Sequence, residues 1–164
     1  MLRSPIRHPE DFAGVAIFAA CLQIAACVDV AVLEADRSAI SMLWFEQHAS
    51  YSSGDVEAFL SILTDDAVMD LPNQPVVVGK DAIRDLIEAS FSRFSFDAVY
   101  LPDELIIEGD WAFDRGNWVE TRNPKDGGDQ EEFSFGILQI YRRTSDGSWK
   151  LARSVWSTNG PMFN

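Results

Sequence analysis

The chain has 164 residues, of which 47% are hydrophobic and 24% are charged. These proportions are typical of one globular domain and exclude a disordered, collagen-like or multi-span membrane protein. Lys and Arg number 13 against 26 Asp and Glu, which gives a net charge of −13. A nucleic-acid partner is excluded because the chain has no basic surface to neutralise phosphates and release counterions.

Residues 1–27 are interpreted as a signal peptide. Two arginines precede an uncharged stretch, residues 12–27, which is shorter than the roughly 20 apolar residues of a bilayer-spanning helix. The stretch ends in the tetrapeptide IAAC, which resembles the bacterial lipobox, whose cysteine takes the lipid. We expect an exported, periplasmic or membrane-anchored lipoprotein, lipidated at Cys27 and touching the membrane only through that anchor. The alternatives are a misassigned start or a buried helix, and then a cytoplasmic protein.

The chemistry available to the remaining domain, residues 32–160, is limited by its composition. Both cysteines, Cys21 and Cys27, lie in the leader, so the domain has no thiol for a disulfide, a thiolate metal site or cysteine catalysis. His8 and His48 are the two histidines, and they cannot supply a three-histidine metal site. Neither a glycine fingerprint for dinucleotides nor a Walker-type loop occurs. The sequence therefore implies no metal and no cofactor.

Two helices are predicted at the start of the domain. Residues 32–51 have apolar side chains at helical spacing, with acidic residues near the beginning. Gly54 is suited to the position just after a helix, and Asp55 is suited to cap the next one. The apolar side of this second helix is formed by Val56, Phe59, Leu60 and Leu63.

A short strand and a third helix follow. Asp65 and Asp66 are predicted to end the second helix and face water. Residues 67–72 form a short strand that its final proline stops, because proline cannot donate to a strand ladder. Residues 76–79 form another brief strand, and residues 80–94 form a helix with apolar residues at helical spacing.

After residue 95 the pattern changes to the period of two that is typical of strands. Four strands are predicted, and the turns between them read EGD, NPKDGGD and TSDG. Such turns join neighbours in an antiparallel meander. Three helices followed by a sheet define an α+β domain. The strands span residues 96–107, 111–122, 131–143 and 148–158.

The order of these motifs resembles a known family. The sequence has GD at the first helix break, DDA before a short strand, Pro72, Gly79 opening a helix, and DGSWKLARSVW on the last strand. Over residues 36–160 this order is similar to the SnoaL-like branch of the nuclear transport factor 2-like superfamily, which includes ketosteroid isomerase. The resemblance implies a cone-shaped domain, in which the helices pack on the concave face of a strongly curved, mainly antiparallel sheet. It also implies a deep apolar pocket and frequent dimerisation through the convex face.

The residues that ketosteroid isomerase uses are replaced in this sequence. That enzyme combines a carboxylate base with an oxyanion hole made of a tyrosine and a neutral carboxylic acid. The matching positions here are Gln47 for the tyrosine, Leu71 for the base and Gln139 for the acid. Steroid-type isomerisation is therefore not implied, and whether the protein is an enzyme stays open.

The same registration implies which residues line the pocket. Among them, Gln47, Arg115, Asn117 and Gln139 form a polar group suited to a carbonyl, carboxylate or hydroxyl ligand. The alternative is that these four satisfy one another as a buried network and bind nothing. The full implied lining is Trp44, Gln47, Leu71, Phe113, Arg115, Asn117, Val119, Phe135, Ile137, Gln139 and Trp156.

Strand alternation then assigns an apolar set to the opposite, convex face. We expect this face to be covered by a second copy of the chain, because large exposed apolar patches mark association sites. The predicted interface of the homodimer consists of Trp118, Leu138, Ile140, Leu151 and Val155.

Two pairs of residues are candidates for proton transfer. Asp70 and His48 could form a general-base pair, since histidine titrates near neutral pH. The alternative is that Asp70 points outward and His48 is merely packed or solvated. Glu120 and Arg122 resemble the acid and base arrangement of limonene-type epoxide hydrolases, and the alternative is an ion pair near a hairpin end.

The sequence thus predicts an exported SnoaL-like dimer that binds a small, partly apolar molecule. Two other functions stay open: a cofactor-free isomerase, lyase or hydrolase that works by proton transfer, and a dimeric protein-association module.

Overall fold

The computed structural model describes residues 12–158, with side chains from residue 30 onward. The chain divides into two compact units, Met1–Ala35 and Asp36–Asn164. Within the described range, no helix is long and apolar enough to cross a membrane. Of the segment interpreted as a signal peptide, residues 1–11 lie outside the described residues, and the rest belongs to the first helix.

Three helices occur in the described part of the chain: α1 (Phe12–Ser53), α2 (Val56–Ser61) and α3 (Lys80–Arg93). The helix predicted for residues 32–51 is the last part of the longer α1. Gly54 has the left-handed φ of 69° that favours glycine just after a helix. Asp55 caps α2 as expected, because its carboxylate accepts a hydrogen bond of 3.0 Å from the Ala58 N–H.

Among residues 12–158, six strands form one sheet in the order β2-β1-β6-β5-β4-β3. Only the β1–β6 pair is parallel, and the other neighbours are antiparallel. The predicted α+β class with helices packed on a mainly antiparallel sheet is confirmed. The strands are β1 (Leu63–Asp70), β2 (Val77–Val78), β3 (Phe94–Glu108), β4 (Trp111–Pro124), β5 (Glu131–Arg143) and β6 (Trp149–Thr158).

One boundary differs from the prediction. β1 begins at Leu63, so Asp65 and Asp66 lie inside a strand rather than at the end of a helix. Both side chains are exposed, as predicted. Asp66 also accepts two hydrogen bonds from the Arg142 guanidinium, which ties β1 to β5 across the sheet surface.

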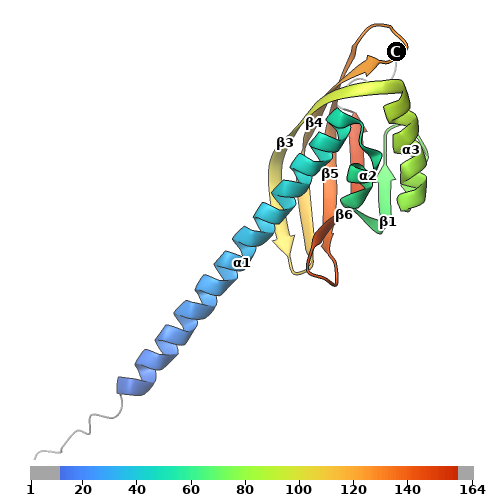
Figure 1. Cartoon of the computed structure of the whole chain (residues 1–164). Helices are drawn as coiled ribbons and strands as arrows, with labels where there is room; N and C mark the ends of the chain where they lie inside the picture. Colours follow the sequence, from blue (N-terminus) through green and yellow to red (C-terminus); the bar gives the residue numbers. More distant parts are fainter. Residues whose placement is uncertain (1–11, 159–164) are drawn as a thin grey trace, which may run out of the picture. The chain divides into compact units, whose positions relative to one another are not determined.

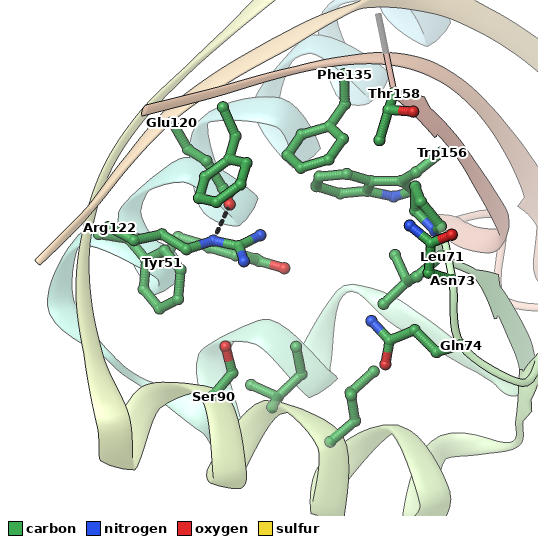
Figure 2. Close-up of a pocket in the computed structure, with 15 residues that line it drawn as sticks. Tyr51, Leu71, Asn73, Gln74, Ser90, Glu120, Arg122, Phe135, Trp156 and Thr158 are labelled. Atoms are coloured by element: carbon green, nitrogen blue, oxygen red, sulfur yellow. Dashed lines mark hydrogen bonds and ion pairs between the residues drawn. The ribbon is translucent and has the colours of Figure 1, made fainter. Parts of the chain in front are cut away.

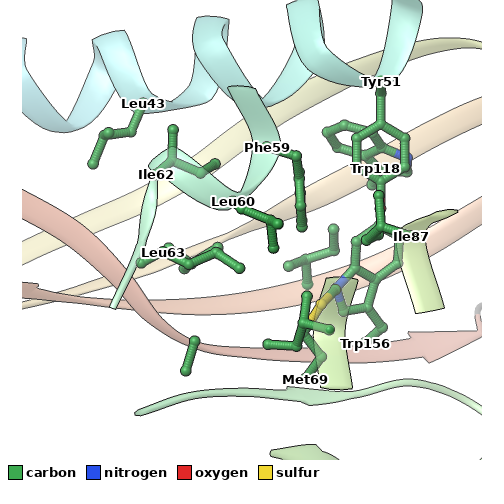
Figure 3. Packing of buried hydrophobic residues seen from close by; sticks show 14 of the residues in the cluster. Leu43, Tyr51, Phe59, Leu60, Ile62, Leu63, Met69, Ile87, Trp118 and Trp156 are labelled. Atoms are coloured by element: carbon green, nitrogen blue, oxygen red, sulfur yellow. The ribbon is translucent and has the colours of Figure 1, made fainter. Parts of the chain in front are cut away.

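The core of the second unit lies between the helices and one face of the sheet (Figure 1). Tyr51 on α1 packs edge-on against Trp118 on β4 with ring centroids 5.2 Å apart (Figure 3). Ile83, Ile87 and Phe91 form the buried side of α3. Burying each such side chain contributes about 1.5 to 3 kcal/mol, so packing rather than helix propensity holds the short helices in place.

The inward side of β4 is the opposite of the predicted one. Asp114, Trp118 and Glu120 are buried, whereas Phe113 and Val119 are exposed. Alternate residues of a strand point to opposite faces, so an error of one residue moves the whole set to the other side. The prediction for this strand was wrong for that reason.

The predicted dimer face needs a related correction. Trp118 and Leu151 are fully buried in the core and are not available to a partner, whereas Leu138 and Val155 are exposed, and Ile140 is half-buried. The pairing of β5 with β6 shifts between Ile140 and Tyr141. Such a bulge reverses the alternation within β6, which places Leu151 inward although Val155 points outward.

Candidate functional site

A cavity of about 280 Å³ opens at one end of the sheet (Figure 2). α3 forms one side of it, the loop after β1 forms another, and the ends of β3 to β6 complete the wall. This volume is near the lower limit of small-molecule sites, which span roughly 300 to 1,000 Å³. The lining consists of Tyr51, Leu71, Pro72, Asn73, Gln74, Leu86, Ile87, Ser90, Phe96, Glu120, Arg122, Phe133, Phe135, Trp156 and Thr158.

Aromatic rings make up much of the cavity wall. Phe133 and Phe135 stack with a ring distance of 5.9 Å, and Phe135 meets Trp156 edge-on at 5.3 Å. Phe96 and Tyr51 contact each other at 5.5 Å on the other side. Rigid aromatic surfaces of this kind bury apolar ligand area at low entropic cost.

Two charged residues, Glu120 and Arg122, lie in this otherwise neutral lining. They are two residues apart on β4 and therefore point to the same face. Glu120 is 2% exposed and accepts hydrogen bonds from Trp118 Nε1 at 2.7 Å and from Arg122 Nε at 2.5 Å. The Arg122 guanidinium lies 4.3 Å from the centre of the Phe133 ring. The carboxylate and the ring together fix the guanidinium at the cavity wall.

Hydroxyl groups face the same space. Figure 2 shows the hydroxyls of Tyr51 and Ser90 pointing into the cavity. Burial raises the pKa of Tyr51, and the Glu120 charge raises it further, although the Arg122 charge opposes this. Tyr51 therefore keeps its proton at neutral pH and can donate a hydrogen bond to a ligand.

Three of the predicted lining residues, Leu71, Phe135 and Trp156, do line this cavity. Trp44, Gln47 and Gln139 lie elsewhere in the interior. The structure brings Gln47 and Gln139 together, because Gln139 Nε2 donates to Gln47 Oε1 at 2.9 Å. Ile137 is buried in the core.

Four β4 residues were placed in the pocket by prediction and lie outside it. Phe113 and Val119 are exposed on the outer face. Arg115 donates to Asp103 at 3.0 Å on the surface, and Asn117 donates to the same carboxylate at 3.4 Å. The polar group predicted from Gln47, Arg115, Asn117 and Gln139 therefore does not form, because the β4 alternation is shifted by one residue.

The predicted proton-transfer pair is also separated from the cavity. His48 is half-buried on α1, and Asp70 is exposed at the end of β1. Neither lines the cavity, and they make no hydrogen bond with each other. Glu120 and Arg122 do form an ion pair, as the alternative interpretation predicted, and Glu120 is buried.

A second group of buried polar residues was not predicted. We call it the inner polar cluster: Trp44, Gln47, Tyr100, Asp114, Gln139 and Tyr141. Tyr141 donates to Gln139 at 2.5 Å, and Trp44 packs edge-on against Tyr100 at 5.6 Å. Asp114 is fully buried. Burial raises the pKa of Asp114 to about 6, although the nearby Tyr100 hydroxyl and Trp44 indole N–H oppose the rise. The two Asp114 oxygens, the Tyr100 hydroxyl and the Trp44 Nε1 make no hydrogen bond within the described residues.

Gly116 explains how Tyr100 reaches this cluster. A Cβ atom at position 116 would lie 2.5 Å from the Leu101 carbonyl oxygen and 2.6 Å from the Tyr100 hydroxyl oxygen. Both distances are far below van der Waals contact, so only glycine fits. The glycine between Asp114 and Trp118 was the signal in the sequence that this face of β4 is crowded and points inward.

Across the residues with described side chains, no group of three or more His, Cys, Asp or Glu residues is arranged to hold a metal ion.

The structure shares its fold with solved structures of the nuclear transport factor 2-like superfamily. A ketosteroid isomerase-like protein from Erwinia carotovora atroseptica is 28% identical, with a TM-score of 0.69, and covers 76% of this chain and 96% of its own. A protein from Planctomyces limnophilus is 25% identical, with a TM-score of 0.71, and covers 76% and 98%. A hexachlorocyclohexane dehydrochlorinase shares the fold at 21% identity, with a TM-score of 0.67, and covers 80% and 90%.

The SnoaL-like domain family matches residues 44–152, so the chain belongs to that family, as its motif order predicted. No curated protein sequence matches the chain.

Proposed function

We propose that the protein binds a small, largely apolar molecule in the cavity described above. One observation carries this proposal: the aromatic wall contains a guanidinium that Glu120 and Phe133 hold in place. Apolar walls with a few fixed polar groups are typical of ligand sites. The ring surfaces would supply affinity, and Arg122, Tyr51 and Ser90 would orient the ligand.

A cavity-filling substitution tests this proposal with 2-ethylnaphthalene as the probe. Ser90→Trp places a large ring in the cavity, whereas Ala89→Trp places the same ring on the exposed side of α3. We expect calorimetric titration to detect binding to the wild type and to Ala89→Trp, but not to Ser90→Trp. Equal binding to both variants, or none to the wild type, would contradict the proposal.

A second candidate function is cofactor-free proton transfer. The observation that favours it is the buried carboxylate of Glu120 at the cavity wall, next to the Tyr51 hydroxyl. In this role Glu120 would be the base, in place of Asp70 or His48, and Arg122 would stabilise the enolate oxygen. Each Glu120 oxygen accepts one hydrogen bond and keeps a second lone pair, which would take the proton.

Solvent exchange distinguishes this enzyme from a binding protein. In D₂O, a base would remove a methyl proton next to the carbonyl of 2-acetylnaphthalene, and a deuteron from solvent would replace it. The enzymatic proposal predicts that proton NMR shows faster loss of the methyl signal with the wild type than with buffer, and no acceleration with Glu120→Gln. A wild-type rate equal to that of buffer would exclude it for this substrate.

We also propose a homodimer through the outer face of the sheet. Val99 pairs with Val119, and Leu138 pairs with Val155, so their exposed side chains adjoin. A buried, unpaired charge at the centre of an interface costs several kcal/mol. Leu138→Asp is therefore expected to give a monomer in sedimentation analysis, and an intact dimer would exclude this face.

Export and lipidation remain part of the proposal for the leader. The IAAC sequence that ends at Cys27 supports it. Metabolic labelling with a palmitate analogue should mark the wild type and not Cys27→Ser. Label retained on Cys27→Ser would exclude lipidation at that residue.

A further inference from the structure

We propose that Glu120 determines whether the cavity binds neutral or negatively charged ligands. In the wild type it makes the cavity select a neutral molecule with an acceptor oxygen over a carboxylate. This inference rests on the proposed binding function and adds the ligand class and the residue that sets it.

The first step is the charge balance of the cavity. Glu120 and Arg122 are the charged members of its lining. They form an ion pair at 2.5 Å, with the Glu120 side chain 1% exposed and the Arg122 side chain 32% exposed. The pair therefore contributes no net charge, although its positive end is the one that reaches the cavity.

The second step concerns the hydrogen-bond donors that face the cavity. Arg122 uses its Nε–H on Glu120, and its two Nη groups make no hydrogen bond within the described residues. Arginine has five N–H donors and no acceptor. The Tyr51 and Ser90 hydroxyls point into the same space (Figure 2). Donors therefore outnumber acceptors beside the pair, and a ligand oxygen that accepts hydrogen bonds would satisfy them.

The third step excludes an anion. A carboxylate beside Arg122 would gain its attraction but would suffer repulsion from Glu120, which is held within hydrogen-bonding distance of the same guanidinium. An anion also loses far more hydration on entering an apolar cavity than a ketone does. The net charge of −13 on the chain adds long-range repulsion. A neutral carbonyl oxygen accepts hydrogen bonds from these donors without the repulsion and with a smaller loss of hydration.

The fourth step follows from removing the negative charge. Glu120→Gln keeps the side-chain shape and can still accept from Trp118 through its amide oxygen. Arg122 then has no counter-ion, so the cavity becomes positively charged. The substitution should move the preference of the cavity from ketones toward carboxylates.

Three naphthalenes with one ring system test the proposal by calorimetric titration at neutral pH: 2-acetylnaphthalene, 2-naphthoate and 2-ethylnaphthalene. For the wild type we expect the ketone to bind roughly tenfold more tightly than either of the other two, as expected for one hydrogen bond to a charged donor. Glu120→Gln should strengthen naphthoate relative to the ketone by roughly tenfold or more. Arg122→Met should bind the ketone no better than the hydrocarbon.

The outcomes separate this proposal from the binding function. Naphthoate binding more tightly than the ketone to the wild type would overturn charge selection but leave the ligand site intact. Equal affinity for all three probes would overturn polar recognition and also leave the site intact. Binding of none of them would overturn the binding function itself. Should Glu120→Gln fail to fold, the wild-type ratio of ketone to naphthoate decides the proposal alone.

Discussion

β4 carries two buried acids on its inner face, and the groups that surround them differ. Glu120 accepts from an indole N–H and from a guanidinium at the cavity wall. Asp114 lies deeper, in the inner polar cluster, beside Tyr100 and Trp44 and without a cation. Both acids are buried, but Glu120 has a cation and an indole N–H as hydrogen-bond donors, whereas the pKa of Asp114 is raised because burial penalises its charged form.

Neutralising Glu120 should have the largest effect on stability. Glu120→Gln weakens two charge-assisted hydrogen bonds, from Trp118 and from the half-buried Arg122, and we expect a loss of about 3 to 4 kcal/mol in the free energy of unfolding. Urea unfolding at neutral pH measures it. Glu132→Gln, an exposed position on β5, is the control and should change stability by less than about 0.5 kcal/mol. Equal stability of the Glu120→Gln protein and the wild type would show that the pair contributes nothing.

The same kind of change at Asp114 should act in the opposite direction. The pKa of Asp114 is about 6 in the folded protein against 3.8 in the reference state. As the pH rises through this window, the unfolded chain releases its proton first, so the wild type loses stability. Asp114→Asn lacks this loss and should be more stable by up to about 3 kcal/mol above pH 6, but not below pH 4. A pH-independent difference would contradict the assignment.

A smaller effect is expected when the cluster is disturbed without touching an acid. Gly116→Ala would place its methyl group against the Leu101 carbonyl and the Tyr100 hydroxyl. Overpacking of this kind costs about 2 kcal/mol, and Tyr100 would have to move away from Asp114. Thermal unfolding measures the loss. A stable Gly116→Ala protein with unchanged near-ultraviolet circular dichroism would show that the close approach is not needed.

The smallest expected effect is the loss of one hydroxyl. Tyr100→Phe removes the hydroxyl dipole that lies near the Asp114 carboxyl group and should reduce stability by about 1 kcal/mol at neutral pH. It should also raise the pKa of Asp114 further, because the nearby Tyr100 hydroxyl favours the ionised form. Carbon-detected NMR titration of the Asp114 carboxyl group would show the direction, and a fall in this pKa would contradict the account.

The fold could be predicted because its signals are local and repeated. Gly54 ends one helix and the Asp55 side chain caps the next by local chemistry, and burial alternates along β5 over residues 133–141. Family membership followed from the order of such signals.

The site could be predicted only in part, because the inward side of a strand depends on tertiary pairing. Both faces of β4 combine large apolar and polar residues, so alternation alone did not choose between Phe113 and Trp118. The acids at 114 and 120 favoured the wrong face, since the partners that keep them buried come from other positions. The bulge between β5 and β6, which turns Leu151 inward, has no marker such as glycine in the sequence.

The central claim is that ligands bind in the aromatic cavity and not in the inner polar cluster, and the indole N–H signals of the tryptophans test it most directly. Trp156 lines the cavity, Trp118 donates to Glu120 behind it, and Trp44 belongs to the cluster. Nitrogen–proton correlation spectra, assigned by single Trp→Phe substitutions, would follow all three during titration with 2-acetylnaphthalene. We predict that the Trp156 and Trp118 signals shift together while Trp44 stays unchanged. A shift of Trp44 with Trp156 and Trp118 unchanged would contradict the account.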